Sequence, residues 1–102
     1  MDLRLALMES SAGVIVTDKD FKVIWGNAFE EEYYKIPVIG LDVVDCHKEE
    51  NKDKIRTFLQ EFKTGQRKSF TKVAVGMLIT YSSYYIDGEF AGVVRTRIRM
   101  ID

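Results

Sequence analysis

Cysteine, proline and histidine are nearly missing from this chain of 102 residues, which has one of each. A single cysteine excludes an internal disulfide framework and a zinc site built from several cysteines, and is typical of a reducing cytoplasm. One proline and seven glycines exclude collagen-like and linker-like sequences. The longest apolar runs are only a few residues, so no membrane-spanning helix is expected. Asp2 and Arg4, directly after Met1, do not fit a secretory signal peptide.

The chain also has little net charge. Fifteen basic and sixteen acidic side chains give a formal charge of -1, so no long-range field attracts the protein to nucleic acid or to an acidic membrane. A hydrophobic share of 46% is enough for one packed core, and the length fits one domain. We therefore expect a single cytoplasmic domain over residues 1–102 that binds neither nucleic acid nor a membrane directly.

The hydrophobic pattern predicts an α+β fold. β-Branched runs and alternating segments indicate strands, and Asp87-Gly88 is a strong hairpin signal. The expected order is a short helix over 2–10, strands over 13–17 and 21–25, short helices and irregular backbone over 26–47 with Asn27 as an N-cap, a long helix over 49–64, and strands over 69–75, 78–86 and 90–100. We expect a five-stranded antiparallel sheet with helices on one side and the long helix across that face.

The long helix has one apolar stripe. Ile55, Phe58, Leu59 and Phe62 follow the i, i+3, i+4, i+7 spacing of one helical face. Such a stripe packs against the sheet as core, and the same side chains can line a ligand cavity inside that core. Gly65 is the expected residue just after the helix C-terminus.

Three arginines alternate along the last expected strand. Arg95, Arg97 and Arg99 therefore share one face of the strand. The opposite face is more apolar and contains Val94, Thr96, Ile98 and Met100. We expect the arginine face to be solvated or to form ion pairs with acidic side chains of a partner, because no nucleic-acid reader motif accompanies it.

Nothing in the sequence supports catalysis. His47 is the only histidine, so it would have to serve every proposed nucleophile and base. The chain has no glycine-rich phosphate-binding loop. We expect that the protein is not an enzyme.

The order of elements, with the residues at both ends, resembles the PAS sensor domain. The stretch GVIVTDKDFKVIWGNAFEEEY (13–33) is similar to the PAS opening of two strands that lead to an asparagine, here Asn27. The stretch IDGEFAGVVRTRIRMID (86–102) is similar to the last PAS hairpin. The resemblance covers Leu5 to Ile101 and implies a PAS fold. It also implies a sensory function and an output domain or signalling protein as partner. We further expect a homodimer that includes the N-terminal helix, because Leu3, Ala6 and Leu7 need burial.

A narrower resemblance concerns LDVVDCHKEENKDKIRTFLQEFKTG (41–65), which is similar to the haem-binding PAS domains of bacterial carbon-monoxide-responsive regulators. It implies haem b in the core, with His47 and Met77 as metal ligands and Ile55, Phe58, Leu59 and Phe62 around the cofactor. The expected signals are carbon monoxide, oxygen, nitric oxide or redox state. Cys46 is adjacent to His47 and is expected to be structural, because neighbouring residues in extended backbone point to opposite sides.

Plainer interpretations exist for the same residues. His47 can hydrogen-bond the turn before the long helix, and Met77 can fill a gap in the core. The whole chain is then a dimerisation or docking domain without cofactor, which uses Leu3, Leu7 and the outer sheet surface. A third possibility is a pocket for a small organic metabolite.

Overall fold

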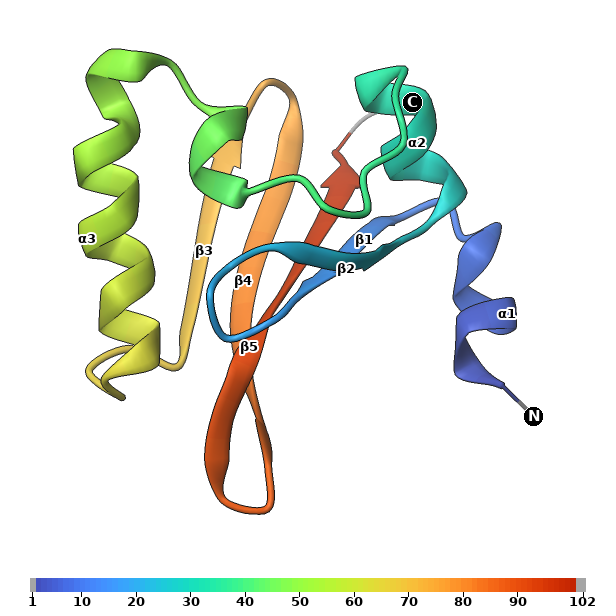
Figure 1. Ribbon diagram of the computed structural model, residues 1–102. Coiled ribbons are helices and arrows are strands. Elements are labelled where there is room, and N and C mark those ends of the chain that lie inside the picture. The colour runs from blue at the N-terminus through green and yellow to red at the C-terminus, as the bar shows by residue number, and fades with distance from the viewer. Residues whose placement is uncertain (1, 101–102) are drawn as a thin grey trace.

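The computed structural model describes residues 2–100 and has one five-stranded antiparallel sheet (Figure 1). The strand order is β2-β1-β5-β4-β3, so the last strand in the chain lies at the centre. This confirms the predicted fold class. The strands are β1 (Gly13–Thr17), β2 (Val23–Gly26), β3 (Ser69–Ala74), β4 (Met77–Ile86) and β5 (Glu89–Arg99). The helices are α1 (Leu3–Met8), α2 (Ala28–Tyr34) and α3 (Lys52–Lys63), with 3₁₀ turns η1 (Val43–Cys46) and η2 (Glu49–Asn51).

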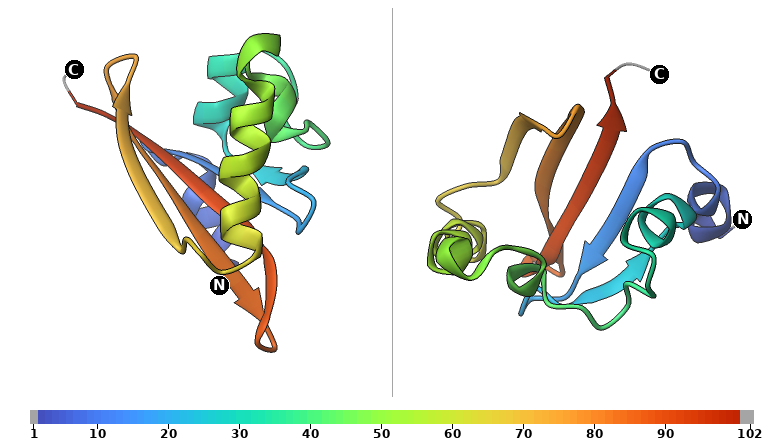
Figure 2. Two further views of the ribbon diagram at one scale, coloured as in Figure 1. Left: turned by 90° about the vertical axis from the view of Figure 1, so that its left-hand side faces the viewer. Right: turned by 90° about the horizontal axis from the view of Figure 1, so that it is seen from above.

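Helices α1 and α3 lie at opposite ends of the sheet (Figure 2). The segment from α2 to α3 covers one face, which we name the inner face. The expectation that all helices lie on one side is wrong for α1, because Leu3 and Leu7 border a groove with Val14 and Val16 on the opposite, outer face. The first helix therefore belongs to a different layer from the other two.

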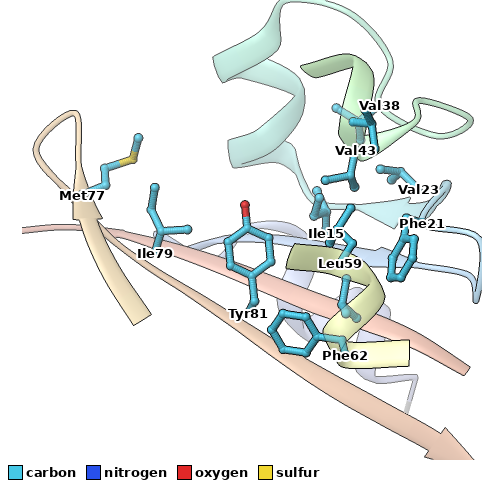
Figure 3. Close-up of a cluster of buried hydrophobic side chains, with 12 residues drawn as sticks. Ile15, Phe21, Val23, Val38, Val43, Leu59, Phe62, Met77, Ile79 and Tyr81 are labelled. Carbon is cyan, nitrogen blue, oxygen red and sulfur yellow. The ribbon is translucent and has the colours of Figure 1, made fainter. Parts of the chain in front are cut away.

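The hydrophobic core fills the space between the inner face and the helices (Figure 3). Leu59 and Phe62 of α3 are fully buried, as the predicted stripe requires. Met77, Ile79 and Tyr81 are buried at alternate positions of β4 and point toward the helices. The alternate residues of β4 and the apolar stripe of α3 therefore pack together in one core.

Two tight turns connect the last three strands. Asp87 and Gly88 both have positive φ, at 52° and 82°, as the two-residue hairpin turn predicted there requires. Val75 and Gly76 form the equivalent turn between β3 and β4, with φ of 48° and 73°. A β-branched residue rarely adopts positive φ, so the second turn carries local strain at Val75.

A close backbone approach fixes the centre of the sheet. Gly92 has a φ of 150°, and a Cβ there would overlap the carbonyl oxygen of Thr17. The Thr17 hydroxyl accepts a hydrogen bond from the Val93 N–H, and the Thr17 carbonyl accepts one from the Tyr84 hydroxyl. Strand β5 pairs with β1 only over 94–97. The hairpin from Tyr84 to Gly92 therefore extends past the rest of the sheet (Figure 1).

Some boundaries differ from the prediction. Helix α3 begins at Lys52, because a 3₁₀ turn precedes it. Strand β2 begins at Val23, because Phe21 has a φ of 67° within the turn. Met100 was expected within the last strand, on its more apolar face, but it follows β5 and is 54% exposed.

Candidate functional site

Two arginines of β5 point into the protein. Arg95 and Arg97 are each 4% exposed, so the predicted solvated face is in fact the inner face. Arg95 is paired in register with Tyr81 of β4 and Ile15 of β1, which are both buried. Sequence alternation separates the two faces of a strand but does not say which one is buried. The interpretation of this face as solvated or partner-bound is therefore wrong for Arg95 and Arg97.

Glu30 of α2 is the acidic partner of both arginines. Its side chain is 0% exposed, and its Oε1 accepts a hydrogen bond of 2.6 Å from Arg95 Nη2. Its Oε2 accepts bonds of 3.0 Å from Arg97 Nε and 2.5 Å from Arg97 Nη2. Charge-assisted pairs of this kind are among the strongest hydrogen bonds in proteins. They tie the helical layer to the central strand.

Tyrosines of α2 complete the surroundings of the arginines. The Arg97 guanidinium lies 3.9 Å from the ring centre of Tyr33, a cation–π distance. Arg95 Nη2 also donates to the Tyr34 hydroxyl at 3.1 Å. A Cβ at Gly13 would overlap the Glu30 carboxylate, so the start of β1 needs glycine to leave room for the ion pair. We name Glu30, Tyr34, Arg95 and Arg97 the arginine cluster.

The arginine cluster carries an excess of positive charge. One carboxylate faces two guanidinium groups, and Glu30 is the only acid within salt-bridge distance of them in the described part of the chain. Arg95 Nε is buried and has no hydrogen-bond partner there. Burial lowers the pKa of Arg95, but the nearby Tyr34, Tyr81 and Glu30 outweigh it, so the pKa is raised and the group stays charged.

His47 lies at the end of η1 and is half-buried. Its Nδ1 is 3.0 Å from the Val43 carbonyl oxygen, so it donates to that oxygen and leaves Nε2 as the free acceptor. Burial lowers the pKa of His47, the bond to Val43 opposes this change, and the positive charges of Lys72 and Arg95 lower the pKa further. His47 is therefore held in its neutral form at neutral pH.

The predicted cofactor-lining residues pack against one another and the sheet. The Phe58 ring lies 5.1 Å from Phe62, 5.0 Å from Phe70 and 5.3 Å from Tyr81, in edge-to-face contacts. Leu59 and Phe62 are buried in the core, and Ile55 and Phe58 are half-buried beside it. A porphyrin between α3 and the sheet would have to separate these rings. As packed, the residues fit a closed aromatic core and do not fit a flat cofactor.

The two predicted metal ligands come from different elements. Met77 is buried at the start of β4 and belongs to the core cluster, as the plainer interpretation required. His47 makes the backbone bond of the plainer interpretation, although its free Nε2 is also the arrangement that metal-binding histidines use. The side chain of Cys46 lies outside the described part of the chain. Haem binding by His47 and Met77 stays a prediction.

The outer face contains an apolar groove. Its volume is about 440 Å³, and it is lined by Leu3, Arg4, Leu7, Val14, Val16, Ile24, Trp25 and Val94. Helix α1 has no buried residue, and Leu3 is 67% exposed. Further apolar side chains, among them Leu78 and Ile98, are exposed on the same face. This apolar surface is the one expected from the sequence to serve in docking.

Asn27 connects this outer helix to the rest of the chain. It stands at the N-cap position of α2, but its side chain forms no capping bond there. Its Nδ2 donates to the carbonyls of Leu7 and Ala12, and its Oδ1 accepts from the Val14 N–H at 3.0 Å. The predicted capping role is wrong, because the amide is used to join α1, β1 and α2.

Solved structures similar to this one include several PAS domains. The PAS domain of BvgS from Bordetella pertussis is 14% identical, with a TM-score of 0.77, over 98% of this chain and 85% of that one. A PAS domain from Colwellia psychrerythraea is 16% identical, with a TM-score of 0.75, over 96% of this chain and 94% of that one. This chain has the PAS fold.

A third similar structure is the PAS domain of the histidine kinase ThkA. It is 16% identical, with a TM-score of 0.65, over 84% of this chain and 96% of that one. No family model matches the sequence, and no curated protein is similar to it. The similarity to known proteins is therefore a similarity of fold. No helix in residues 2–100 is long and apolar enough to cross a membrane.

Sequence analysis missed the arginine cluster. The run FEEEYY over 29–34 places an acid and two tyrosines on α2, and the alternating arginines lie more than sixty positions later. The sequence did contain a signal for this pairing. A short helix with three adjacent acids and a strand with three alternating arginines, in one PAS domain, indicate that the helix and the strand form ion pairs. The sequence does not say which of the three acids forms the ion pairs, because that depends on how α2 packs on the sheet.

Proposed function

We propose that this protein is a sensory PAS domain without catalytic activity, which forms a homodimer through α1 and the outer sheet face and passes a signal to an output domain or partner. The PAS domain of a histidine kinase among the similar structures supports the sensory part. The exposed apolar groove beside α1 supports the dimer. The groove is the observation on which the proposal rests.

A second copy of the chain is the occupant that fits this groove. A helix of six residues is marginal in water, and α1 leaves Leu3, Leu5 and Leu7 exposed. The apolar sheet face lies next to these leucines on the same surface. A two-fold arrangement can therefore place the helix of each copy against the sheet face of the other, which is a self-complementary interface.

Sedimentation equilibrium tests the dimer. We expect Leu7→Glu and Ile98→Glu to shift the protein to monomer, because each buries a charge in the interface. Ile39→Glu is the control, since Ile39 is also an exposed apolar residue but lies in the loop after α2. A wild-type monomer at high concentration, or an unchanged dimer in both interface variants, contradicts the proposal.

Haem binding is the second candidate function, favoured by the free Nε2 of His47. Bound haem b would supply an iron that binds carbon monoxide, oxygen or nitric oxide. His47 and Met77 are the residues that would hold the iron. The closed ring contacts of Phe58 would have to open, so this candidate requires a core that rearranges.

Absorption spectroscopy after haem addition tests this candidate. If His47 is the ligand, His47→Ala loses the haem spectrum, Met77→Leu changes only the spectrum of the reduced state, and the neighbouring exposed Lys48→Ala changes nothing. A protein that takes up no haem, or a His47→Ala spectrum equal to wild type, contradicts the candidate and leaves the cofactor-free dimer in place.

A further inference from the structure

We propose that the free edge of β3 binds an extended acidic segment of a partner protein, which adds a strand to the sheet beside α3. Strand β3 lies at one end of the sheet. The apolar groove of the proposed dimer lies toward the other end, against β1 and β2. The two surfaces are therefore separate, so this contact goes beyond the proposed function and each of the two can fail alone.

The other edge of the sheet is already covered by the chain itself. The Val23 N–H of β2 donates to the Leu41 carbonyl at 2.8 Å, and the Gly40 N–H donates to the Val23 carbonyl at 2.7 Å. Lys22 and Asp42 form a β-bridge beside these bonds. An extended segment thus occupies the edge of β2 through its backbone, which shows the kind of occupant that a sheet edge of this protein accepts.

The edge of β3 has no such cover within residues 2–100. The Ser83 N–H donates to the Lys68 carbonyl, so the alternation of an antiparallel ladder turns the N–H and C=O groups of Ser69, Thr71 and Val73 away from β4. None of these groups has a backbone partner in the described part of the chain. In the left view of Figure 2, β3 lies in front, with α3 beside it. Such an edge is a template for an added strand.

Helix α3 provides a second wall next to this edge. The half-buried ring of Phe58 contacts the half-buried ring of Phe70 from β3. Arg67 lies over both rings and 3.5 Å from the Glu61 carboxylate. A hollow of about 350 Å³ adjoins these groups and is lined by Asp53, Lys54, Thr57, Phe58 and Glu61. An apolar side chain of the added strand can therefore pack against the exposed parts of the two rings.

The charges beside the edge select an acidic segment. Lys72 is half-buried on the inner side of β3 and forms no ion pair within residues 2–100. The same holds in that range for Lys54 of α3 and for Lys68, which precedes β3. The nearby acids Asp53 and Glu61 already pair with arginines. Three lysines thus lack a carboxylate here, and an acidic residue opposite Lys72 would supply one.

A second copy of β3 is a poor occupant of the same edge. Two β3 strands pair through all three free residues only in an antiparallel register centred on Thr71. That register places the two Lys72 side chains at diagonal positions on one face, about 7–8 Å apart. The like charges oppose this pairing, so the occupant has a different sequence.

A synthetic peptide designed as the antiparallel complement of β3 tests the edge. In the sequence Val-Glu-Thr-Phe-Thr the glutamate lies opposite Lys72, the central threonine opposite Thr71 and the phenylalanine opposite Phe70. We expect the amide resonances of Thr71 and Val73 to shift saturably when wild-type protein is titrated with this peptide. The amide of Val23, on the covered edge of β2, is the internal control and should not shift.

N-methylated peptides test whether the backbone makes the contact. A methyl group on the nitrogen of the central threonine removes the donor to the Thr71 carbonyl, and should weaken binding about tenfold. The matched control carries the methyl group on the nitrogen of the glutamate, whose N–H points away from β3 in the same register. This control peptide should keep its affinity.

A charge exchange tests the selection of acidic segments. Wild-type protein should bind Val-Lys-Thr-Phe-Thr about fivefold more weakly than the glutamate peptide. Lys72→Glu should reverse this preference. Lys19→Glu is the control, because it makes the same charge change at an exposed lysine between β1 and β2. The amide spectrum of each variant verifies that it is folded.

Four results would overturn the proposal. They are no saturable shift with the glutamate peptide, equal shifts at Thr71 and Val23, equal losses with the two N-methylated peptides, and equal affinity of wild type for the two charge forms. Shifts of Thr71 and Val73 on dilution of the protein alone would assign the edge to a second copy and also overturn it. A monomeric protein that binds the glutamate peptide as expected rejects the proposed dimer and leaves the edge site standing.

Discussion

Single side chains in this protein take their properties from neighbours far away in the sequence. The pKa of His47 is lowered because the residue is half-buried and because the charges of Lys72 of β3 and Arg95 of β5 act on it. Asn27 holds three backbone groups of three different segments instead of capping its own helix. In both cases the residue type could be noticed in the sequence, but the role depends on partners that only the fold provides.

The lowered pKa of His47 predicts a loss of stability in mild acid. Above about pH 6.5 the residue is neutral in both the folded and the unfolded chain. As the pH falls below that value, the unfolded chain binds a proton first, so the free energy of unfolding decreases until the folded-state pKa is passed. Urea unfolding at pH 7.5, 6.5 and 5.5 measures this decrease.

The matched variant for this measurement is His47→Gln, which retains a side-chain donor for Val43. Since His47 is the only histidine, the variant should lose less stability than wild type between pH 7.5 and 5.5. Parallel pH curves for the two proteins would show that the decrease belongs to other groups.

At the scale of elements, the sequence was informative wherever the pattern is local. The spacing of Leu59 and Phe62 predicted α3, and Asp87-Gly88 predicted the last hairpin. The buried face of β5 was not predictable, because alternation is the same whether Arg95 and Arg97 point to water or to Glu30. The position of α1 on the outer side was not predictable for a similar reason. The apolar side of α1 shows that it packs against something, but not against which face of the sheet.

The turn between β3 and β4 contains the least suitable residue for its geometry. Val75 has a φ of 48°, which asparagine adopts far more readily than a β-branched residue. We expect Val75→Asn to raise the free energy of unfolding by about 1 kcal/mol. Thermal and urea unfolding measure the gain.

Val73→Asn is the control for the turn, because Val73 is exposed in the same hairpin but lies within β3. Asparagine is disfavoured in strands, so this variant should be less stable than wild type. A loss of stability in both variants would mean that the strain at Val75 contributes nothing.

On the scale of the whole molecule, the arginine cluster joins the two layers. Glu30 comes from α2 and its partners from β5, the central strand of the sheet. We expect Glu30→Ala to destabilise the protein by about 3–5 kcal/mol, because it leaves two buried guanidinium groups without their carboxylate. Urea unfolding at neutral pH measures the change.

Glu32→Ala is the control on the same helix. Its carboxylate pairs with Lys35 on the surface, and exposed pairs of this kind contribute little to stability. Equal effects of the two variants would mean that the layers are held by the hydrophobic core alone.

The close approach of Gly92 to Thr17 also means that the last hairpin is held at its base, whereas its end extends beyond the other strands. Beyond Gly92 the strands β4 and β5 pair only with each other, and the turn at Asp87-Gly88 lies four to five residues away, or about 15 Å at the rise of a strand. A rotation of the hairpin by about 10° at Gly92 would move the turn by about 3 Å. Small changes in the centre of the sheet are thereby converted into larger displacements at its periphery.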